Sequence, residues 1–310
     1  MTEEVKDPSG LCAGTRQEST LPYLLMIVLQ CAIYGLGNPI TKIAFESVTP
    51  LWCLALRFTM ATLVLAVFAG RKALKELRTA SVSAWLPCAL CMAGAYIFCN
   101  IALNLTTATA VGFLMSLPVL FVPGLSFFVL HRPYRKSFLP VQLAAAGGLY
   151  LLCSNGGTFS FGWGETLGVL VAVCVAGALV WGEKSLKSLS PLTVSLTQLL
   201  VTALISVPGA LLFERGTDLS AIRPSAWWVI VYLALLCSCL AYLLQNTALT
   251  HLPASIVSLL QCTEPVFTAA ASFFLLGERL SGPGWWGAAL LFVCILYGNY
   301  LELSGQKAAE

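Results

Sequence analysis

The sequence has few charged residues and almost no histidine. Only 10% of its 310 residues are Asp, Glu, Lys or Arg, whereas 58% are hydrophobic. A soluble domain carries about 25% charged residues, so a water-soluble fold of this length could not bury so much apolar surface. Lipid must cover most of it. The net charge of +3 is small and the basic residues are scattered, which argues against a nucleic-acid partner.

The scarcity of histidine also argues against a metal site or an enzyme. Almost all of the twelve cysteines lie in apolar runs, including the pairs Cys88 with Cys91 and Cys237 with Cys239. A metal site normally needs histidines or more cysteines nearby, so we interpret these cysteines as small apolar packing residues. No H-E-x-x-H, G-x-S-x-G or G-x-x-x-x-G-K motif is present. We therefore expect no metal, no cofactor, no catalytic residue and no ATP-driven step.

Ten apolar runs are each long enough to cross a bilayer as a helix, which needs about 20 residues. They lack the alternation of a transmembrane β-strand, and unpaired backbone groups are too costly in lipid for any open structure. The sequence therefore predicts an all-α integral membrane protein with ten transmembrane helices. The expected helices cover residues 21–41, 50–69, 85–104, 107–130, 137–154, 163–182, 190–213, 226–249, 253–276 and 283–301. We expect residues 1–20 to form a disordered cytoplasmic tail and residues 302–310 a C-terminal tail.

The second half of the chain repeats the first, about 147 residues later. The segment 95–103 matches 241–249 at five of nine positions, and Pro118-Val119 matches Pro265-Val266. Many secondary transporters are built from such repeats, with the substrate near the repeat interface. Because each repeat has an odd number of helices, we expect the two repeats to be inverted. The expected repeats are residues 21–154 and 163–301.

The distribution of Lys and Arg predicts the orientation in the membrane. If the N-terminus lies inside, the inner segments hold twelve basic residues and the outer loops hold four. Because basic residues concentrate on the cytoplasmic side, we expect both termini in the cytoplasm.

Several short motifs resemble those of a known family. They are Leu56-Arg57-Phe58, Ala102-Leu103, Glu264-Pro265-Val266-Phe267 and Leu276-Gly277-Glu278-Arg279-Leu280. With the repeat, this pattern resembles the drug/metabolite transporter superfamily, specifically its ten-helix EamA type. The resemblance implies metabolite transport by alternating access, often export, across a bacterial inner membrane. The first repeat departs from the pattern, because it has Leu130-His131-Arg132-Pro133 in place of the last motif and no carboxylate before Pro118.

Glu264 is the main candidate for proton coupling. It lies about twelve residues into the ninth segment, close to the middle of the bilayer, where a carboxylate is costly unless protonated, paired or hydrated. Pro265 follows it and removes a backbone hydrogen bond. Glu264 could bind a proton that is exchanged for substrate, or it could be a protonated structural residue that bonds a neighbouring helix.

Polar side chains recur four residues apart on the expected helices, and so on one helix face. Tyr96 and Asn100 form such a pair on the third helix, and Tyr242 and Asn246 repeat it on the eighth. These groups could bond other helices or bind a substrate in a central cavity, which the resemblance favours. The candidate substrate-binding residues are Tyr34, Asn38, Tyr96, Asn100, Ser116, Trp181, Tyr242, Gln245, Asn246 and Gln261. For Trp181 an interfacial anchor is the alternative.

Three further residues are candidates for a structural or gating role. Arg57 in the second helix could snorkel or tether a carbonyl. Pro118 and Pro265 predict matching bends in the fourth and ninth helices, which could act as hinges.

Three charged residues lie at the ends of expected helices. Lys42 ends the first helix and could snorkel or gate an outer vestibule. Glu183 and Lys184 end the sixth helix, and we expect both to be solvated.

The sequence predicts a secondary-active transporter, an exporter, of small neutral, zwitterionic or amphipathic metabolites such as amino acids. Expected partners are a small-molecule substrate and the lipid bilayer, with the protein as monomer or homodimer in a bacterial plasma membrane. Two transporter alternatives stay open: an uncoupled facilitator or exchanger, and an organellar nucleotide-sugar or phosphate antiporter. A membrane enzyme would need a nucleophile with its base, or a metal set, and a sensor would normally carry a soluble module.

Overall fold

The computed structural model of the protein describes residues 20–106, 108–132, 136–153, 162–277 and 282–307. Every regular element in these ranges is helical. The elements are α1 Leu21–Ala44, α2 Pro50–Thr79, α3 Val82–Leu105, α4 Ala108–Ser116, α5 Pro118–Leu130, η1 Lys136–Phe138, α6 Leu139–Cys153, α7 Trp163–Ser185, α8 Pro191–Phe213, η2 Leu219–Ala221, α9 Pro224–Tyr232, η3 Leu233–Leu240, α10 Ala241–Leu249, α11 Ala254–Gln261, α12 Glu264–Leu276 and α13 Gly282–Lys307. The segment η3 is π-helical, whereas η1 and η2 are single 3-10 turns.

These elements form ten rods, because three rods consist of consecutive pieces: α4–α5, α9–η3–α10 and α11–α12. Within the described residues, seven rods are long and apolar enough to cross a membrane, and two more contain shorter apolar stretches. The outer surface is apolar, as a lipid-facing surface must be. Four outward-facing side chains are 81–82% exposed: Val67, Phe68, Phe213 and Phe274. The predicted all-α membrane fold with ten helices is confirmed.

Two helices run past their predicted ends. α2 continues to Thr79, although its apolar run stops near residue 69, and α13 continues to Lys307. Residues 71–78 contain Arg, Lys, Ala, Leu and Glu, all good helix formers. The helix therefore continues where hydropathy alone places a loop.

Hydrogen bonds between the ends of rods show that α2 and α8 run in opposite directions, as expected if each rod crosses the membrane once. Glu214, directly after α8, accepts hydrogen bonds from the backbone N–H groups of Leu51 (3.1 Å) and Trp52 (3.0 Å) at the start of α2. At the other end of this pair, Glu76 near the end of α2 accepts one from the backbone N–H of Ser190, directly before α8 (2.9 Å). α2 and α8 are therefore antiparallel, and each carries a carboxylate that caps the N-terminus of the other.

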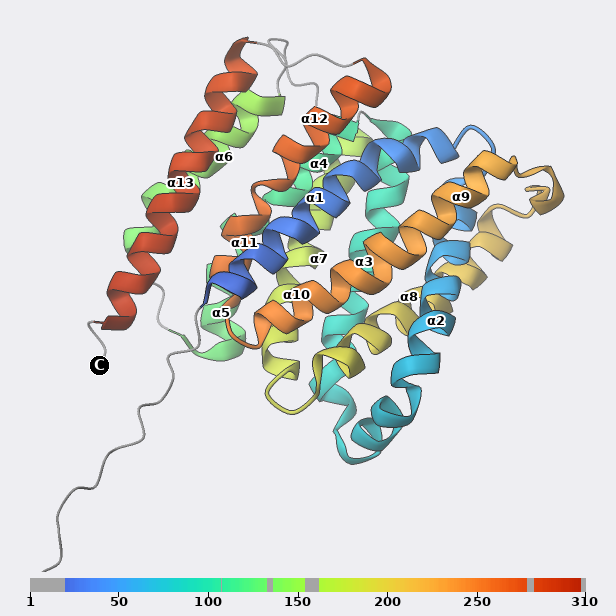
Figure 1. Ribbon diagram of the computed structural model, residues 1–310, viewed down its shortest axis with the longest axis horizontal. Coiled ribbons are helices and arrows are strands. Elements are labelled where there is room, and N and C mark those ends of the chain that lie inside the picture. Colours follow the sequence, from blue (N-terminus) through green and yellow to red (C-terminus); the bar gives the residue numbers. More distant parts are fainter. Residues whose placement is uncertain (1–19, 107, 133–135, 154–161, 278–281, 308–310) are drawn as a thin grey trace, which may run out of the picture.

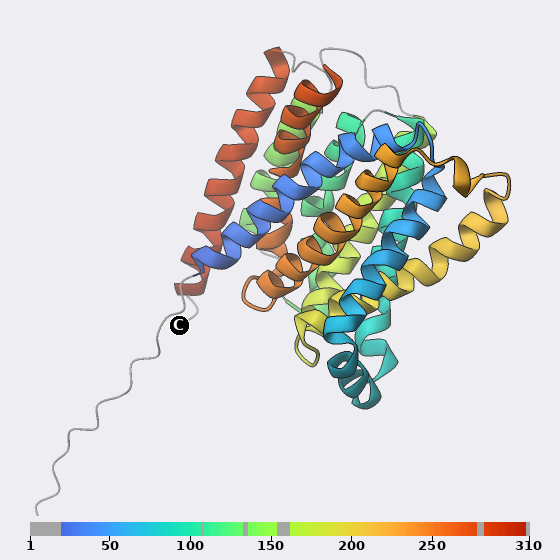
Figure 2. The same ribbon diagram turned by 45° about the vertical axis from the view of Figure 1, so that its right-hand side comes forward.

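The two halves of the chain interdigitate. α2 packs against α8, α3 against α7, and α1 against α12. α6 and α13 lie side by side at one edge of the bundle in both views (Figures 1 and 2). Each pair joins a helix of the first five rods to one of the last five. Because five is an odd number, the second half enters the membrane from the side opposite to the first.

Candidate functional site

A polar cavity lies between the two halves and has two lobes. The Arg57 lobe is lined by α1, α2, α3, α4 and η3, and the Glu264 lobe by α1, α3, α4, α7, α10, α11 and α12. Each lobe has a volume of about 20 Å³, which is room for about one water molecule. The lobes adjoin, and the lining residues common to both are Tyr34, Tyr96, Cys99 and Met115.

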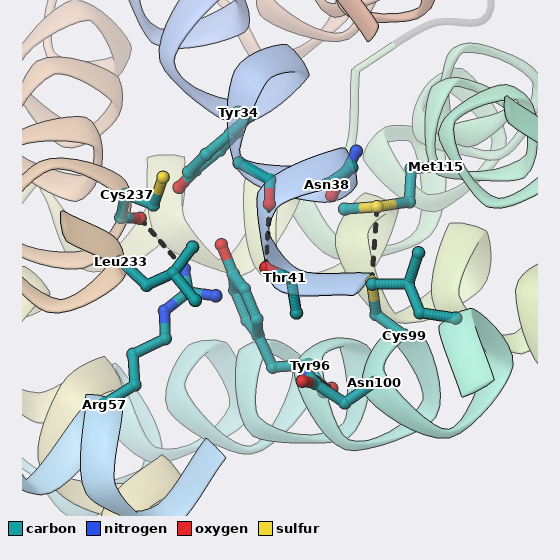
Figure 3. Close-up of a pocket in the computed structure, with 12 residues that line it drawn as sticks. Tyr34, Asn38, Thr41, Arg57, Tyr96, Cys99, Asn100, Met115, Leu233 and Cys237 are labelled. Carbon is teal, nitrogen blue, oxygen red and sulfur yellow. Dashed lines mark hydrogen bonds between the residues drawn. The ribbon is translucent and has the colours of Figure 1, made fainter. Parts of the chain in front are cut away.

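Arg57 reaches the cavity from α2 and is 5% exposed. Its Nε donates a hydrogen bond to Ser238 Oγ (2.8 Å), and its Nη2 donates one to the carbonyl of Cys237 (3.3 Å). Both acceptors belong to η3, and π-helical turns inside α-helices frequently mark functional sites. The guanidinium also lies 4.9 Å from the ring centroid of Tyr96. In Figure 3 the guanidinium and the hydroxyl groups of Tyr34 and Tyr96 converge on one space.

Glu264 lies at a break in the ninth rod. The break falls at Cys262 and Thr263, and Glu264 is the first residue of α12. Its side chain is 4% exposed and lines the Glu264 lobe. Its Oε1 accepts a hydrogen bond from Asn38 Nδ2 on α1 (3.2 Å). Within the described residues, no basic side chain forms an ion pair with it, so the amide of Asn38 and the N-terminus of α12 stabilise this carboxyl group.

Three glutamines from three rods meet beside Glu264. Gln245 Oε1 on α10 accepts hydrogen bonds from Gln30 Nε2 on α1 (2.7 Å) and Gln261 Nε2 on α11 (3.1 Å). All three side chains are buried. The Oε1 atoms of Gln30 and Gln261 have no hydrogen-bond partner among the described residues. Because a buried polar atom without a partner is costly, Gln261, which lines the Glu264 lobe, can accept a further hydrogen bond from a guest.

The fourth rod is broken in the same way as the ninth, and the two breaks touch. The fourth rod is interrupted at Leu117, directly before Pro118, and the ninth at Cys262 and Thr263, two residues before Pro265. Each proline lacks the N–H that would continue the helical hydrogen bonding. Ser116 Oγ donates to the carbonyl of Gly112 in its own helix (3.1 Å) and lies 3.5 Å from the carbonyl of Gln261, which residue 265 leaves free. In return, Cys262 Sγ donates to the carbonyl of Ser116 (3.7 Å). The pseudo-equivalent breaks therefore lie against each other, and a side chain of each contacts a backbone carbonyl of the other.

Eight of the predicted site residues line the cavity: Tyr34, Asn38, Arg57, Tyr96, Asn100, Gln245, Gln261 and Glu264. Arg57 was expected to be a tether, and in the structure it both bonds η3 and faces the cavity. The remaining six line neither lobe: Ser116, Pro118, Trp181, Tyr242, Asn246 and Pro265.

The residues outside the lobes have other contacts. Asn246 Nδ2 donates hydrogen bonds to Ser195 Oγ (2.8 Å) and Gln198 Oε1 (2.9 Å), both on α8. Tyr242 packs behind the cavity, stacked on Tyr96 with ring centroids 5.9 Å apart. Trp181 is half-buried against an apolar cluster at the end of α7.

Sequence reasoning missed part of the lining and one residue of the glutamine cluster beside it. Gln30 bonds Gln245, and it lies four residues before Tyr34 and eight before Asn38 on α1. That spacing places all three on one face, so the pattern could have identified Gln30. Cys99 and Met115 also line the cavity, but as apolar residues in apolar helices they cannot be told from packing residues in the sequence.

Glu183 corrects another expectation. It was expected to be solvated with Lys184, yet it is 7% exposed whereas Lys184 is exposed. Arg132, directly after α5, forms an ion pair with it (2.5 Å), and the backbone N–H of Ala254 donates a hydrogen bond to it (2.8 Å). A helix-end carboxylate is buried here because two other rods supply partners.

Both halves of the chain match one family model, that of the EamA-like transporter family, over residues 21–154 and 162–299. The uncharacterized transporter YwfM of Bacillus subtilis (strain 168) is 28% identical over 302 residues, which cover 93% of this chain and 97% of that protein. The uncharacterized transporter YetK of the same strain is 26% identical over 291 residues, with 90% and 86% coverage.

One further relative matches over a smaller part of the chain, and one solved structure is similar at lower identity. Protein PecM of Dickeya dadantii (strain 3937) is 28% identical over 196 residues, which cover 62% of this chain and 65% of that protein. A solved crystal structure superposes with a TM-score of 0.73 at 19% identity, over 91% of this chain and 96% of that chain. At this identity the superposition shows the fold.

Proposed function

Because the chain belongs to the EamA-like transporter family, we propose that it is a secondary-active transporter of small neutral, zwitterionic or amphipathic metabolites, such as amino acids. Membership makes it a multi-pass membrane transporter rather than an enzyme. The observation that carries the proposal is the cavity between the halves. It gathers an acid, a guanidinium and several amides inside an apolar bundle, where polar groups are costly and mark transport pathways.

Alternating access requires the cavity to open to each side in turn. Each lobe holds about one water molecule, so a metabolite binds only when rods move apart. Lys42 at the end of α1 closes one end, because its Nζ donates to the carbonyl of Thr106 after α3 (2.9 Å). The contacts of Glu183 with Arg132 and Ala254 close the opposite end. We expect each set to break when its end opens.

The direction of transport is part of the proposal. The excess of Lys and Arg on one side supports cytoplasmic termini. With this orientation the Glu183 end would lie inside and the Lys42 end outside. The bacterial relatives support a bacterial plasma membrane. We propose export, by a monomer or homodimer.

Glu264 is proposed to couple transport to protons. Its carboxyl group lines the cavity, is bonded by Asn38, and has no basic partner within the described chain. A proton on this group and a substrate in the same lobe would compete, which is the requirement for exchange of one against the other.

The test is substrate-driven proton movement in proteoliposomes. A pH dye is placed inside, and amino acids, nucleosides or amphipathic cations are added outside. We expect one class to drive proton movement in the wild-type protein and in Glu46→Gln, whose carboxylate lies on the surface and is 65% exposed, but not in Glu264→Gln. Uptake of radiolabelled substrate by wild-type protein without proton movement would instead show a facilitator or exchanger.

The phosphate or nucleotide-sugar antiporter is disfavoured by the lining. Arg57 is the one basic side chain in the two lobes as the described residues define them. Phosphate monoesters carry about 1.5 to 2 negative charges at pH 7, and Arg and Lys are the side chains that usually bind phosphate groups.

A further inference from the structure

Arg57 is a buried cation without an acidic partner. It is 5% exposed, and no carboxylate of the described chain lies within 4.0 Å of it. A guanidinium has five N–H donors, and its hydrogen bonds to η3 involve Nε and Nη2. Both partners are neutral, so the positive charge is not compensated. An uncompensated charge inside a membrane protein is strongly disfavoured and by default marks a functional site.

The guanidinium is also held rigidly. Nε and Nη2 are fixed by Ser238 and Cys237 of η3, and the rings of Phe58 and Tyr96 lie 5.1 and 4.9 Å away. A planar guanidinium in a fixed orientation is suited to bind a carboxylate with two parallel hydrogen bonds. It lies in the space onto which the Tyr34 and Tyr96 hydroxyls also point (Figure 3).

The adjoining lobe has the opposite character. Glu264 lines it, and so do Gln245 and Gln261, whose Oε1 atom is buried without a partner among the described residues. These oxygens accept hydrogen bonds and favour a cationic donor such as an ammonium group. Between and around the polar groups lie apolar side chains, Met92, Met115 and Val175.

We propose that the two lobes bind the two ends of a small zwitterion: Arg57 binds its carboxylate, and Glu264 with Gln261 binds its ammonium. This inference rests on the proposed function and narrows its substrate class. Neutral nucleosides and amphipathic cations lack a group for Arg57, whereas an amino acid with an apolar side chain carries a carboxylate for Arg57, an ammonium for Glu264 and an apolar part for the wall. Arg57 is then a residue that determines specificity as well as a tether.

The test uses matched ligands and the purified full-length protein in detergent micelles. A panel of neutral α-amino acids is titrated, and thermal stabilisation reports binding. Each amino acid is compared with its carboxamide, which lacks the carboxylate, and with its N-acetyl derivative, which lacks the ammonium. In the wild-type protein we expect at least one free amino acid to bind roughly 10- to 100-fold more tightly than both derivatives.

The variants separate recognition from structural damage. Arg57→Met should bind the free amino acid no better than its carboxamide, and Arg57→Lys should keep part of the preference. Structural damage alone would weaken both ligands equally and leave their ratio unchanged. Arg223→Met is the matched control, because Arg223 is 65% exposed at the surface and pairs with Glu46.

Several outcomes would overturn the zwitterion proposal. It is wrong if wild-type protein binds an amino acid and its carboxamide equally, or if Arg57→Met keeps the full preference. It is also wrong if only nucleosides or amphipathic cations bind, a result that leaves the proposed transport function intact. If no compound of the panel binds or drives transport, both proposals fail. Should Arg57→Met not fold, the ligand ratios of wild-type protein and Arg57→Lys still decide.

Discussion

Two asparagines that the duplication makes equivalent have different surroundings. Asn100 and Asn246 occupy matching positions in the segments 95–103 and 241–249. Asn100 lines the Arg57 lobe, and among the described residues its Nδ2 bonds only the carbonyl of Tyr96 in its own helix (3.0 Å). Asn246 instead bonds Ser195 and Gln198 of α8. One asparagine is available to a substrate, whereas the other joins two helices.

This difference predicts opposite effects of the same substitution. Asn246→Ala removes two interhelical hydrogen bonds and should lower the free energy of unfolding by about 1 kcal/mol, with the apparent substrate affinity unchanged. Asn100→Ala should leave stability almost unchanged and weaken substrate binding. Thermal unfolding in detergent and the concentration dependence of uptake measure the two effects. Equal losses of stability in both variants would contradict the assignment.

The comparison also shows which site residues the sequence could predict. The spacing of Tyr34 with Asn38 and of Tyr96 with Asn100 selected one face of α1 and of α3, and that face lines the cavity. The same spacing in Tyr242 and Asn246 selected a face that packs on other helices. Spacing identifies a shared face, but which neighbour that face meets depends on packing against a distant segment.

The pairing of α1 with α12 depends on close backbone approach. A Cβ atom on Gly35 would lie 2.8 Å from the backbone nitrogen of Thr268 and 2.9 Å from the backbone carbon of Phe267. These helices carry Asn38 and Glu264, which bond each other. Packing at Gly35 therefore sets the geometry of the Glu264 lobe.

Gly35→Ala should force α1 and α12 apart, at a cost of about 1–3 kcal/mol of stability. Transport should fall further than stability predicts, because the bond between Asn38 and Glu264 lengthens. Gly124→Ala is the matched control, since nothing lies within 4 Å of a Cβ atom there and alanine favours a helix. Thermal unfolding and initial uptake rates measure both changes, and a Gly35→Ala protein as active as Gly124→Ala would refute this role.

The sequence predicted where the ten rods lie, but it did not predict where the helical hydrogen bonding within a rod is interrupted. Apolar length identified all ten rods, and Pro118 and Pro265 indicated bends. In the structure the α-helical hydrogen bonding is interrupted by a tight turn close to each proline, and a side chain at each interruption contacts a carbonyl of the other rod. A π-helical stretch in the eighth rod also had no sequence signal, since it forms where Arg57 bonds Cys237 and Ser238.

In the whole molecule, the duplication places related closing contacts at opposite ends. α1 and α7 begin the two halves, and their last turns carry Lys42 and Glu183. Each contacts its own half where the third rod gives way to the fourth: Lys42 bonds Thr106 directly after α3, and Glu183 bonds Ala254, the first residue of α11. The side chains differ in charge, so the repeat was not visible at these positions in the sequence. The positions are equivalent, and inversion puts them on opposite sides of the membrane.

This arrangement predicts that each contact controls access from one side. Cys99 lines both lobes and is 3% exposed, so a membrane-impermeant thiol reagent should label it slowly from either side of oriented proteoliposomes. Lys42→Met should accelerate labelling from its own side only, and Glu183→Gln from the opposite side only. A contact that contributes about 1 kcal/mol to the closed state changes the open population about fivefold. Mass spectrometry identifies Cys99 among the cysteines, and Lys72→Met at an exposed position on α2 is the control. If both variants increased labelling from the same side, the two contacts could not be alternating closures of one cavity.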